Sequence, residues 1–454
     1  MSGDRAVVIG LGRSGLACAR TLAGEGYRVL VVDRNDGDAQ REAARSLPSG
    51  VDVRLGGYAD DIAVGAAMVC PSPGVPWDAP ELQAARQHGV PVHSEMDLVF
   101  MRCRGKLVGI TGTNGKTTTT SLVAAILQRA GFRVHLGGNI GATMLDRLDT
   151  VHAGDWVVLE LSSFQLETIA EPACSIAAVL NVTPDHLDRH RTMQAYTETK
   201  QRLVRFAVDD VVIGHDDHVS RAMAGLARAP ARYFGFDIGS HDGSTVHDEH
   251  IVSIESGQPT AVLPVADVPL FGRHNVLNVL AAVAVSRAAG APHDAAAGAV
   301  RDFHPVPHRL QTVLDEDGIL WVNDSKATNV DSALMALRSF GDRPIVWIGG
   351  GQGAGTSSDA LVDEIAARAR LAVLNGASAP ELDRALAERG FAARSVVATL
   401  VDAVEEARRL AVAGDVVLLA PGFKSFDQFR DFEERGDVFA AQVRRLRHAA
   451  QEQH

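Results

Sequence analysis

Short, wholly apolar runs rich in Val and Ile recur along the chain and alternate with Ala-rich amphipathic segments. They include residues 6–9, 28–32, 106–110, 156–159 and 345–348. An uninterrupted apolar run fits a strand buried on both faces of a parallel sheet, whereas a half-exposed strand alternates. Two adjacent parallel strands must be joined by a crossover connection, and the amphipathic segments are predicted to form the helices of these connections. The pattern predicts an α/β protein with mostly parallel sheets flanked by helices.

Length and two interruptions divide this pattern into three parts. At roughly 150 residues per domain, a chain of this size predicts about three domains. A new glycine-rich unit begins after residues 91–104, and two prolines interrupt the chain within residues 303–308. We therefore predict domains at residues 1–94, 95–305 and 306–454.

Composition indicates which classes of partner the protein binds and in which cellular compartment it resides. Lys and Arg total 44 against 56 Asp and Glu, and this net charge of -12 disfavours general binding to nucleic acid or anionic membranes. The four cysteines form no CxxC pair, which favours free thiols in a reducing compartment. Neither a signal peptide nor an apolar run of the ~20 residues that span a bilayer is evident. We expect a cytoplasmic protein, and a monomer.

A first glycine-rich turn, Gly10-Leu-Gly12-Arg-Ser-Gly15, follows an apolar run and opens a helical segment, and Asp33 ends the next run. Glycines in such a turn let a pyrophosphate approach the backbone at a helix N-terminus. Three interpretations remain open: an NAD site of an oxidoreductase, a site for another pyrophosphate such as a nucleotide sugar, and a turn that needs glycine only for packing. Ser72-Pro73-Gly74 is predicted to form a second turn at the same sheet edge.

A second glycine-rich loop, Thr111-Gly-Thr-Asn-Gly-Lys116-Thr117, lies between the apolar run 106–110 and the helical segment 121–129. Backbone N–H groups of such a loop can bind nucleotide phosphates, while Lys116 reaches the β- and γ-phosphates and the Thr117 hydroxyl binds Mg²⁺. The strict phosphate-loop pattern is not met, because its first glycine would fall on Ile110. The order of strand, Gly-Lys-Thr and helix still favours a phosphate site over a structural turn.

Two further segments carry metal-binding side chains. Glu160 follows the apolar run 156–159 directly, and a carboxylate at the end of a strand beside a phosphate loop can hold Mg²⁺. The alternative is that Glu160 is a solvent-exposed glutamate without a ligand. Residues 182–190 place two Asp and two His in one loop after the predicted strand 175–181. A lone histidine is more often structural, but beside a metal and phosphate site His186 is a candidate ligand or acid–base group.

Lys200 falls on the apolar stripe of a predicted helix. Met193, Tyr196, Leu203 and Val204 share that stripe. A buried ammonium is costly unless it is paired or chemically altered. The alternatives are that Lys200 reaches solvent along its stem, or that it is modified to serve a metal site.

Together these motifs resemble the Mur ligase family, over essentially the whole chain. The motifs that carry the resemblance are residues 111–118, 138–141, 159–166, 181–188, 272–278, 308–309, 323–329 and 427–436. The resemblance implies an α/β fold of three domains, Rossmann-like at the N- and C-terminal ends with a phosphate-loop ATPase in the centre. It implies an enzyme that uses ATP and Mg²⁺ to add D-glutamate to UDP-N-acetylmuramoyl-L-alanine through an acyl phosphate, in peptidoglycan precursor synthesis.

The resemblance also implies the residues of each site. The UDP-linked substrate would be bound by Arg13, Ser14, Asp33, Arg34, Ser72, Pro73, Gly74, Asn139, Ser162 and His186. ATP would be bound by Thr113, Asn114, Gly115, Lys116, Thr117, Thr118, Asn275, Asn278, Arg309, Asp324 and Lys326. Metal ligands would be Thr117, Glu160, His186 and a carbamylated Lys200, and the catalytic residues Lys116, Glu160, His186 and Lys200. The amino acid would be bound by Thr328, Lys424, Ser425 and Phe432.

One stretch departs from the family. Members usually carry a Lys or Arg after the strand at 345–348, where it grips the glutamate carboxylate, but residues 349–358 contain neither. We hypothesise that Lys424 replaces this cation. The alternatives are that backbone N–H groups bind the carboxylate, or that the amino acid differs, for example L-glutamate.

Three other functions make different predictions. A folylpolyglutamate-synthase-like enzyme should lack the unit at residues 10–15. An NAD-dependent oxidoreductase explains that unit but leaves Lys116, Thr117 and Glu160 without a role. A non-catalytic ATP-binding regulator should bind nucleotide without releasing phosphate.

Overall fold

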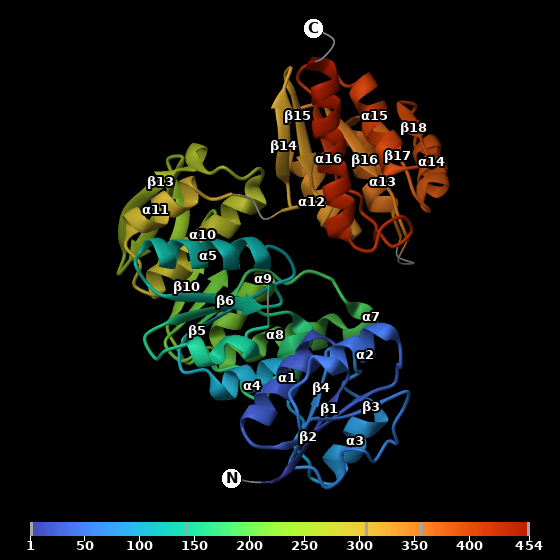
Figure 1. Ribbon diagram of the computed structural model, residues 1–454. Helices are drawn as coiled ribbons and strands as arrows, with labels where there is room; N and C mark the ends of the chain where they lie inside the picture. The colour runs from blue at the N-terminus through green and yellow to red at the C-terminus, as the bar shows by residue number, and fades with distance from the viewer. Residues whose placement is uncertain (1–2, 142, 305–306, 354–356, 452–454) are drawn as a thin grey trace. The chain divides into compact units, whose positions relative to one another are not determined.

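The computed structural model describes residues 3–141, 143–304, 307–353 and 357–451 (Figure 1). The chain forms two compact units, one of residues 1–267 and 277–302, the other of residues 268–276 and 303–454. The first unit contains two sheets and the second contains one. The predicted α/β fold with mostly parallel sheets is confirmed.

The first sheet of unit one has the order β3-β2-β1-β4 and is parallel throughout. Alternate residues of β1 enter two different cores, Ala6 and Val8 on one face and Val7 and Ile9 on the other. Burial on both faces explains why its sequence is apolar throughout. The elements are β1 (Arg5–Ile9), α1 (Arg13–Gly24), β2 (Arg28–Asp33), α2 (Asp38–Arg45), β3 (Asp52–Leu55), β4 (Met68–Pro71), α3 (Pro80–Gln87) and α4 (Glu95–Arg102).

The second sheet of unit one has the order β13-β12-β11-β10-β9-β8-β5-β7-β6. Its pairs from β6 to β11 are parallel, and β11, β12 and β13 form an antiparallel meander at one edge. The strands are β5 (Lys106–Thr111), β6 (Val134–Gly138), β7 (Trp156–Glu160), β8 (Ile176–Val179), β9 (Asp210–Gly214), β10 (Ala231–Phe234), β11 (Gly243–His247), β12 (His250–Glu255) and β13 (Gln258–Pro264). The helices are α5 (Lys116–Arg129), α6 (Ser163–Thr168), α7 (Leu187–His190), α8 (Met193–Arg205), α9 (His218–Ala222), α10 (Arg273–Ala288) and α11 (His293–Arg301), with short 3₁₀ turns η1 (Leu145–Thr150), η2 (Met223–Leu226) and η3 (Val265–Asp267). The first turn of α10, up to residue 276, belongs to unit two.

The sheet of unit two has the order β14-β15-β19-β16-β17-β18 and is parallel except for the β14–β15 pair. The side chains on its two faces pack into separate cores, one beneath α12 to α14 and the other beneath α15 and α16. The elements are β14 (Gln311–Glu316), β15 (Ile319–Asn323), α12 (Val330–Leu337), η4 (Arg338–Phe340), β16 (Ile345–Gly349), α13 (Asp359–Arg368), β17 (Ala369–Leu374), α14 (Ala379–Glu388), β18 (Arg394–Val396), α15 (Leu400–Leu410), β19 (Val416–Leu419) and α16 (Phe432–Gln451).

Some element boundaries differ from the sequence expectation. Helix α5 begins at Lys116 rather than at residue 121, because Gly115 has φ +85° and turns the chain directly into the helix. The threonines that follow are buried, and Thr120 Oγ1 donates to the Lys116 carbonyl, so this β-branched run packs within the helix. The loop expected at residues 182–190 contains the short helix α7.

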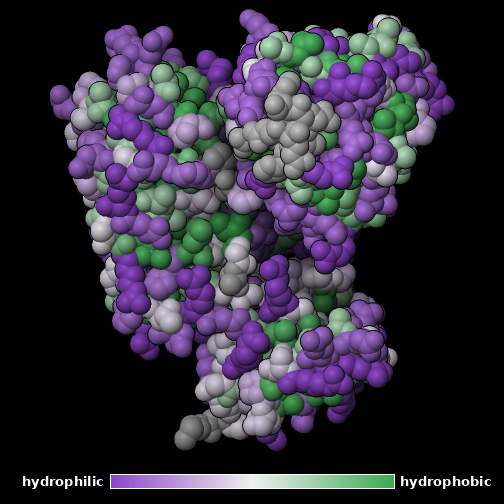
Figure 2. Space-filling model, turned by 45° about the horizontal axis from the view of Figure 1, so that its top comes forward, coloured by the Kyte–Doolittle hydropathy of each residue, from purple (hydrophilic) through white to green (hydrophobic). Residues whose placement is uncertain are grey.

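The surface is mainly polar, and the cysteines are in the state expected from the sequence. Polar residues predominate on the face in Figure 2, and hydrophobic ones form small groups. All four cysteines are free, as predicted. Within the part of the chain that is described, every helix is too short or too polar to span a bilayer.

Candidate active site

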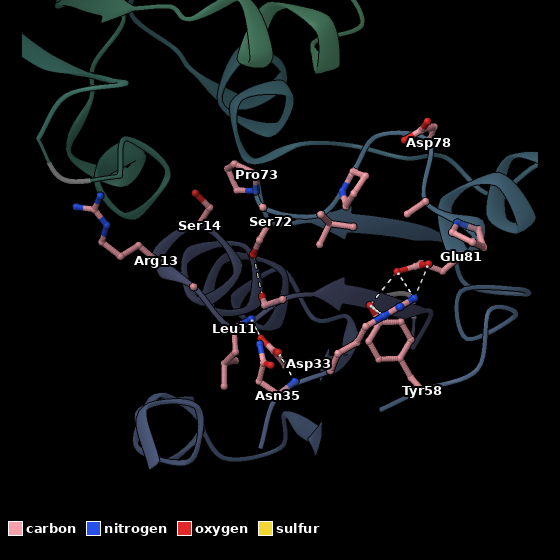
Figure 3. Close-up of a pocket in the computed structure, with 18 residues that line it drawn as sticks. Leu11, Arg13, Ser14, Asp33, Asn35, Tyr58, Ser72, Pro73, Asp78 and Glu81 are labelled. Carbon is pink, nitrogen blue, oxygen red and sulfur yellow. Dashed lines mark hydrogen bonds and ion pairs between the residues drawn. The ribbon is translucent and has the colours of Figure 1, made fainter. Parts of the chain in front are cut away.

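A pocket of about 720 Å³ opens at the carboxyl ends of β1, β2 and β4 (Figure 3). The predicted substrate residues among its lining are Arg13, Ser14, Asp33, Arg34, Ser72, Pro73 and Gly74. The glycine turn is fixed from two sides, since Ser72 Oγ donates to the Gly10 carbonyl (2.9 Å) and Leu11 N–H donates to Asp33 Oδ2 (2.8 Å). Seven of the ten residues predicted to bind the UDP-linked substrate therefore meet in one pocket, with the N-terminus of α1 at its wall, whereas Asn139, Ser162 and His186 lie outside its lining.

Two residues that sequence reasoning missed complete this pocket. The Arg34 guanidinium lies over the Tyr58 ring, 5.2 Å from its centroid, and pairs with Glu81 at 3.2 Å. Tyr58 Oη donates to Glu81 Oε1 (2.8 Å), and Glu81 is only 2% exposed. Tyr58 and Glu81 belong to no local motif, so the sequence carries no signal that joins them to Arg34.

The second glycine-rich loop connects β5 to α5 and has the geometry of a phosphate site. Gly115 is the N-cap of α5, and a Cβ there would collide with the Asn278 side chain. Thr117 and Thr118 follow in the first turn of this 14-residue helix, whose free N–H groups favour anions. The ammonium of Lys116 donates to the Gly112 and Thr113 carbonyls at 2.9 and 2.7 Å, which holds its charge at the loop.

Glu160 lies beside this loop, because β7 pairs with β5 and places Glu160 opposite Ile110. Asn139 Nδ2 donates to Glu160 Oε1 (3.0 Å), while Oε2 is buried and accepts no hydrogen bond. Leaving a buried carboxylate oxygen unsatisfied is costly, and a cation would remove that cost. Among the described residues, however, no three His, Cys, Asp or Glu side chains group closely enough to hold a metal ion. A hard metal here would need other oxygens as well, such as the Thr117 hydroxyl and nucleotide phosphates.

Lys200 is buried on α8, with 1% of its surface exposed. Its ammonium donates to the Gly112 carbonyl (3.0 Å) and Thr111 Oγ1 (3.3 Å), and it lies 4.6 Å from the centre of the Tyr196 ring. Burial, and secondarily the nearby charge of Lys116, hold the pKa of Lys200 well below its ordinary value. The alternative in which Lys200 reaches solvent is therefore wrong.

The histidines of residues 182–190 occupy different environments. His186 has φ +53°, and its side chain is 47% exposed, 4.8 Å from the Phe164 ring. His190 is instead buried, is hydrogen bonded to Ser163 Oγ (3.0 Å), and has a pKa lowered by burial. His186 is thus the more accessible of the two, as a ligand or substrate contact requires.

In unit two, three of the predicted nucleotide residues lie close to β15: Asp324 and Lys326 follow it, and Arg309 precedes β14, which pairs with β15. Leu310 N–H donates to Asp324 Oδ1 (3.1 Å), and burial raises the pKa of Asp324 to about 6 despite the opposing charge of Arg309. The ammonium of Lys326 lies 5.5 Å from the centre of the Phe432 ring. Asn275 belongs to the segment that packs in this unit, whereas Asn278 belongs to unit one.

Two of the predicted amino-acid residues, Lys424 and Ser425, lie on the loop after β19, whereas Thr328 lies between β15 and α12 and Phe432 begins α16. Gln352 and Lys424 pair through their backbones, with N–H···O distances of 2.8 and 3.2 Å. Lys424 is exposed and Ser425 is buried. The loop after β16 that lacks a cation therefore runs beside Lys424, although its residues 354–356 lie outside the described part.

Sequence reasoning missed the role of Arg435 next to this loop. Its guanidinium is buried and donates to the Phe423 carbonyl (3.1 Å) and to Ser325 Oγ (2.9 Å) and O (2.8 Å). Burial lowers the pKa of Arg435 to about 10. Arg435 thereby fixes the segment that carries Lys424 and Ser425. Arg435 lies within the motif at residues 427–436, and this position could have indicated its role from the sequence.

Known proteins match the chain along most of its length. The MurD-like N-terminal domain of Mur ligases matches residues 4–94, the Mur ligase middle domain residues 110–286, and the Mur ligase glutamate ligase domain residues 308–423. The N-terminal match argues against a folylpolyglutamate-synthase-like enzyme, which we expected to lack this unit.

Individual relatives and solved structures agree with these matches. The UDP-N-acetylmuramoylalanine–D-glutamate ligases of Acidobacterium capsulatum and Anaeromyxobacter dehalogenans are 40% and 41% identical, covering 99% and 97% of this chain and 98% and 97% of their own. The structure of the UDP-N-acetylmuramate-alanine ligase of Thermotoga maritima is 18% identical, covers 97% of this chain and 99% of its own, and shares the fold with a TM-score of 0.62. With relatives of this identity over the full length and three family domains in order, the chain belongs to the Mur ligase family.

Proposed function

We propose that the protein is an ATP-dependent ligase that joins D-glutamate to UDP-N-acetylmuramoyl-L-alanine in peptidoglycan precursor synthesis. Two relatives of 40% and 41% identity, aligned over nearly the whole chain, carry the name of this activity. The observation that carries the proposal is the buried, unsatisfied oxygen of Glu160 beside the loop of Lys116. A cytoplasmic location fits this reaction, because ATP is supplied there. That the protein is a monomer remains a prediction.

The UDP portion is assigned to the pocket of about 720 Å³ in the proposed N-terminal domain, residues 1–94. From there the substrate would pass Asn139 and Ser162 toward Glu160, where the L-alanyl carboxylate has to react. The ATP phosphates are assigned to the Lys116 loop of the domain at 95–305. The nucleoside is assigned to Asn275, Asn278, Arg309, Asp324 and Lys326, and the amino acid to Thr328, Lys424, Ser425 and Phe432.

In the proposed reaction, the L-alanyl carboxylate attacks the γ-phosphate of ATP, and an acyl phosphate and ADP result. The amine of D-glutamate then attacks the carbonyl carbon, and inorganic phosphate leaves. The first step brings two anions together, so positioning and charge neutralisation supply much of the catalysis. Lys116 provides a fixed positive charge for this purpose.

Magnesium is the metal that this donor set suits. Thr117, Glu160, His186 and a carbamylated Lys200 would hold it, and bound Mg²⁺ would neutralise phosphate charge. The pKa of Lys200 favours the neutral amine, which is the form that reacts with CO₂. The carbamate would replace a buried cation by oxygen ligands.

Phosphate release is the direct test of this function. With UDP-N-acetylmuramoyl-L-alanine and ATP present, we expect D-glutamate to stimulate phosphate release and L-glutamate to leave it near background. A panel of D- and L-amino acids separates the proposed reaction from ligation of another amino acid. Nucleotide binding without stimulated phosphate release would indicate the non-catalytic regulator, and binding of NADH detected by its fluorescence would indicate the oxidoreductase.

Lys424→Ala should raise the KM for D-glutamate about tenfold or more and change kcat much less. The backbone of Lys424 pairs with Gln352 of the cation-free loop after β16, and its exposed side chain is free to pair with a glutamate carboxylate. A hydrogen bond to a charged group is worth roughly 1.5–3 kcal/mol. Arg430→Ala, which alters an exposed cation paired with Glu434 in the same segment, serves as the matched control. An unchanged KM would show that backbone groups or another side chain bind this carboxylate.

A further inference from the structure

A second, smaller pocket of about 130 Å³ adjoins the nucleotide pocket in unit one. The two pockets share Ser72, Pro73 and Val75 as lining residues. The smaller one extends to Asn139 and Ser162, and Asn139 contacts Glu160. A UDP-linked substrate that spans from the nucleotide pocket to Glu160 would therefore place its sugar at the small pocket.

Glu95 is the single carboxylate among the lining residues of this pocket, all of which are described. It is the first residue of α4 and is 7% exposed. Ser14 Oγ donates to Glu95 Oε2 (3.0 Å). A carboxylate offers about four acceptor sites, so this donor leaves capacity for a ligand. Burial raises the pKa of Glu95, which reflects the cost of keeping this charge away from water.

Other polar groups of the pocket already serve internal hydrogen bonds. Ser162 and Gln165 form a reciprocal capping box at the start of α6. Ser72 donates to the Gly10 carbonyl, and Arg189 pairs with Glu167 at 3.0 Å. Glu95 is thus the strongest acceptor that the pocket offers to a ligand.

The other walls of the pocket are apolar. Val75, Trp77 and Phe164 line it together with prolines. A group that presents an N–H donor and a methyl side by side would fit both the carboxylate and these walls. The 2-acetamido group of an N-acetylated sugar has this chemistry.

We propose that Glu95 is a specificity-determining residue that accepts a hydrogen bond from the acetamido N–H of the UDP-linked sugar, while Trp77 and Phe164 contact the acetyl methyl. This inference rests on the proposed function, because it assumes that the neighbouring pocket binds UDP. It assigns a substrate contact to a residue outside the glycine-rich turns.

The test compares the dissociation constants of UDP, UDP-N-acetylglucosamine and UDP-glucose by isothermal titration calorimetry on the full-length protein. The two sugars differ only at the 2-position, where one has an acetamido group and the other a hydroxyl. We expect the wild type to prefer the acetamido sugar by about tenfold, as loss of a hydrogen bond to a charged group predicts. Glu95→Ala should reduce this preference to within about twofold. Because Ser14 of the nucleotide pocket loses its acceptor in this variant, the preference is taken as the ratio of the dissociation constants of the two sugars in the same variant. Glu95→Gln, a neutral acceptor of the same shape, should retain part of it.

Glu25→Gln is the matched control, because Glu25 pairs with Arg102 at the far end of α4 and is exposed. This variant should keep the wild-type preference. Equal affinity of the wild type for both sugars, or an undiminished preference in Glu95→Ala, would overturn the inference alone. Failure of UDP itself to bind the wild type would overturn the proposed nucleotide pocket as well. If Glu95→Ala does not fold, an undiminished preference in Glu95→Gln overturns the inference.

Discussion

Lys116→Ala is expected to lower kcat for D-glutamate-dependent phosphate release by about a thousandfold. The ammonium of Lys116 is held at the phosphate loop by two backbone carbonyls, where it can offset the repulsion between the substrate carboxylate and the γ-phosphate. Two unit charges about 4 Å apart interact by roughly 4 kcal/mol at the effective dielectric constant of a protein surface. That energy corresponds to about three powers of ten in rate. Single-turnover phosphate release measures the effect on the chemical step.

Lys106→Ala is the matched control for this variant. Lys106 begins β5, the strand that ends in the phosphate loop, and its exposed side chain stacks on Trp156. Removing this lysine changes the charge of the protein by the same amount but leaves the loop intact, so kcat should stay within about twofold of the wild type. If Lys116→Ala kept more than a tenth of the wild-type kcat, the assignment of the γ-phosphate to this loop would be wrong.

Lys200→Ala and Lys200→Met are expected to lower kcat by about a hundredfold or more, as removal of a group that stabilises charge in an active site does. Met fills the buried space without the amine, so loss in both variants separates the chemistry of Lys200 from its packing. Glu198→Ala, an exposed change on the same helix, should have little effect. The measurement is the same phosphate-release assay at saturating Mg²⁺.

Chemical rescue distinguishes a carbamate from an ammonium. If Lys200 acts as a carbamate, formate or acetate can occupy the space vacated in Lys200→Ala and supply the missing oxygens, so kcat should rise by about tenfold or more. Lys200→Met leaves no space for the acid and should not respond. Rescue of Lys200→Ala by methylamine rather than by carboxylic acids would contradict the carbamate and favour a cationic role.

Local sequence was sufficient for much of the fold because each signal has a local physical cause. Residues buried on both faces make a strand apolar throughout, and β1 and β16 follow this rule. A chain that turns sharply into a helix N-terminus needs glycine, as at Gly10 and Gly115. The start of α5 was misplaced because the weak helix propensity of its threonines argued against a helix there, whereas Gly115 turns the chain into the helix and the threonines are buried within it.

The scarcity of lysine in the sequence was a further indication of the site residues, and it was not used in the prediction. Only five of the 44 basic residues are lysines: Lys106, Lys116, Lys200, Lys326 and Lys424. Four of them are candidate site residues, while arginine forms most of the ion pairs in the described part of the chain. In a chain so poor in lysine, each lysine is a candidate for a role that arginine cannot fill, such as a neutral buried amine.

The sequence by itself determined the wholly apolar strands, such as those at residues 6–9, 106–110 and 345–348, the two glycine-rich turns and the residues at their ends, because these depend on neighbours a few positions away. Only the tertiary structure decided that Lys200 is buried rather than solvated, that one Glu160 oxygen lacks a partner, and that Glu95 lines a pocket beside Ser14. Burial and hydrogen-bond satisfaction depend on residues that are distant along the chain, Ser14 and Glu95 being 81 positions apart. Periodicity cannot report such contacts, since it records which face of an element is covered but not what covers it.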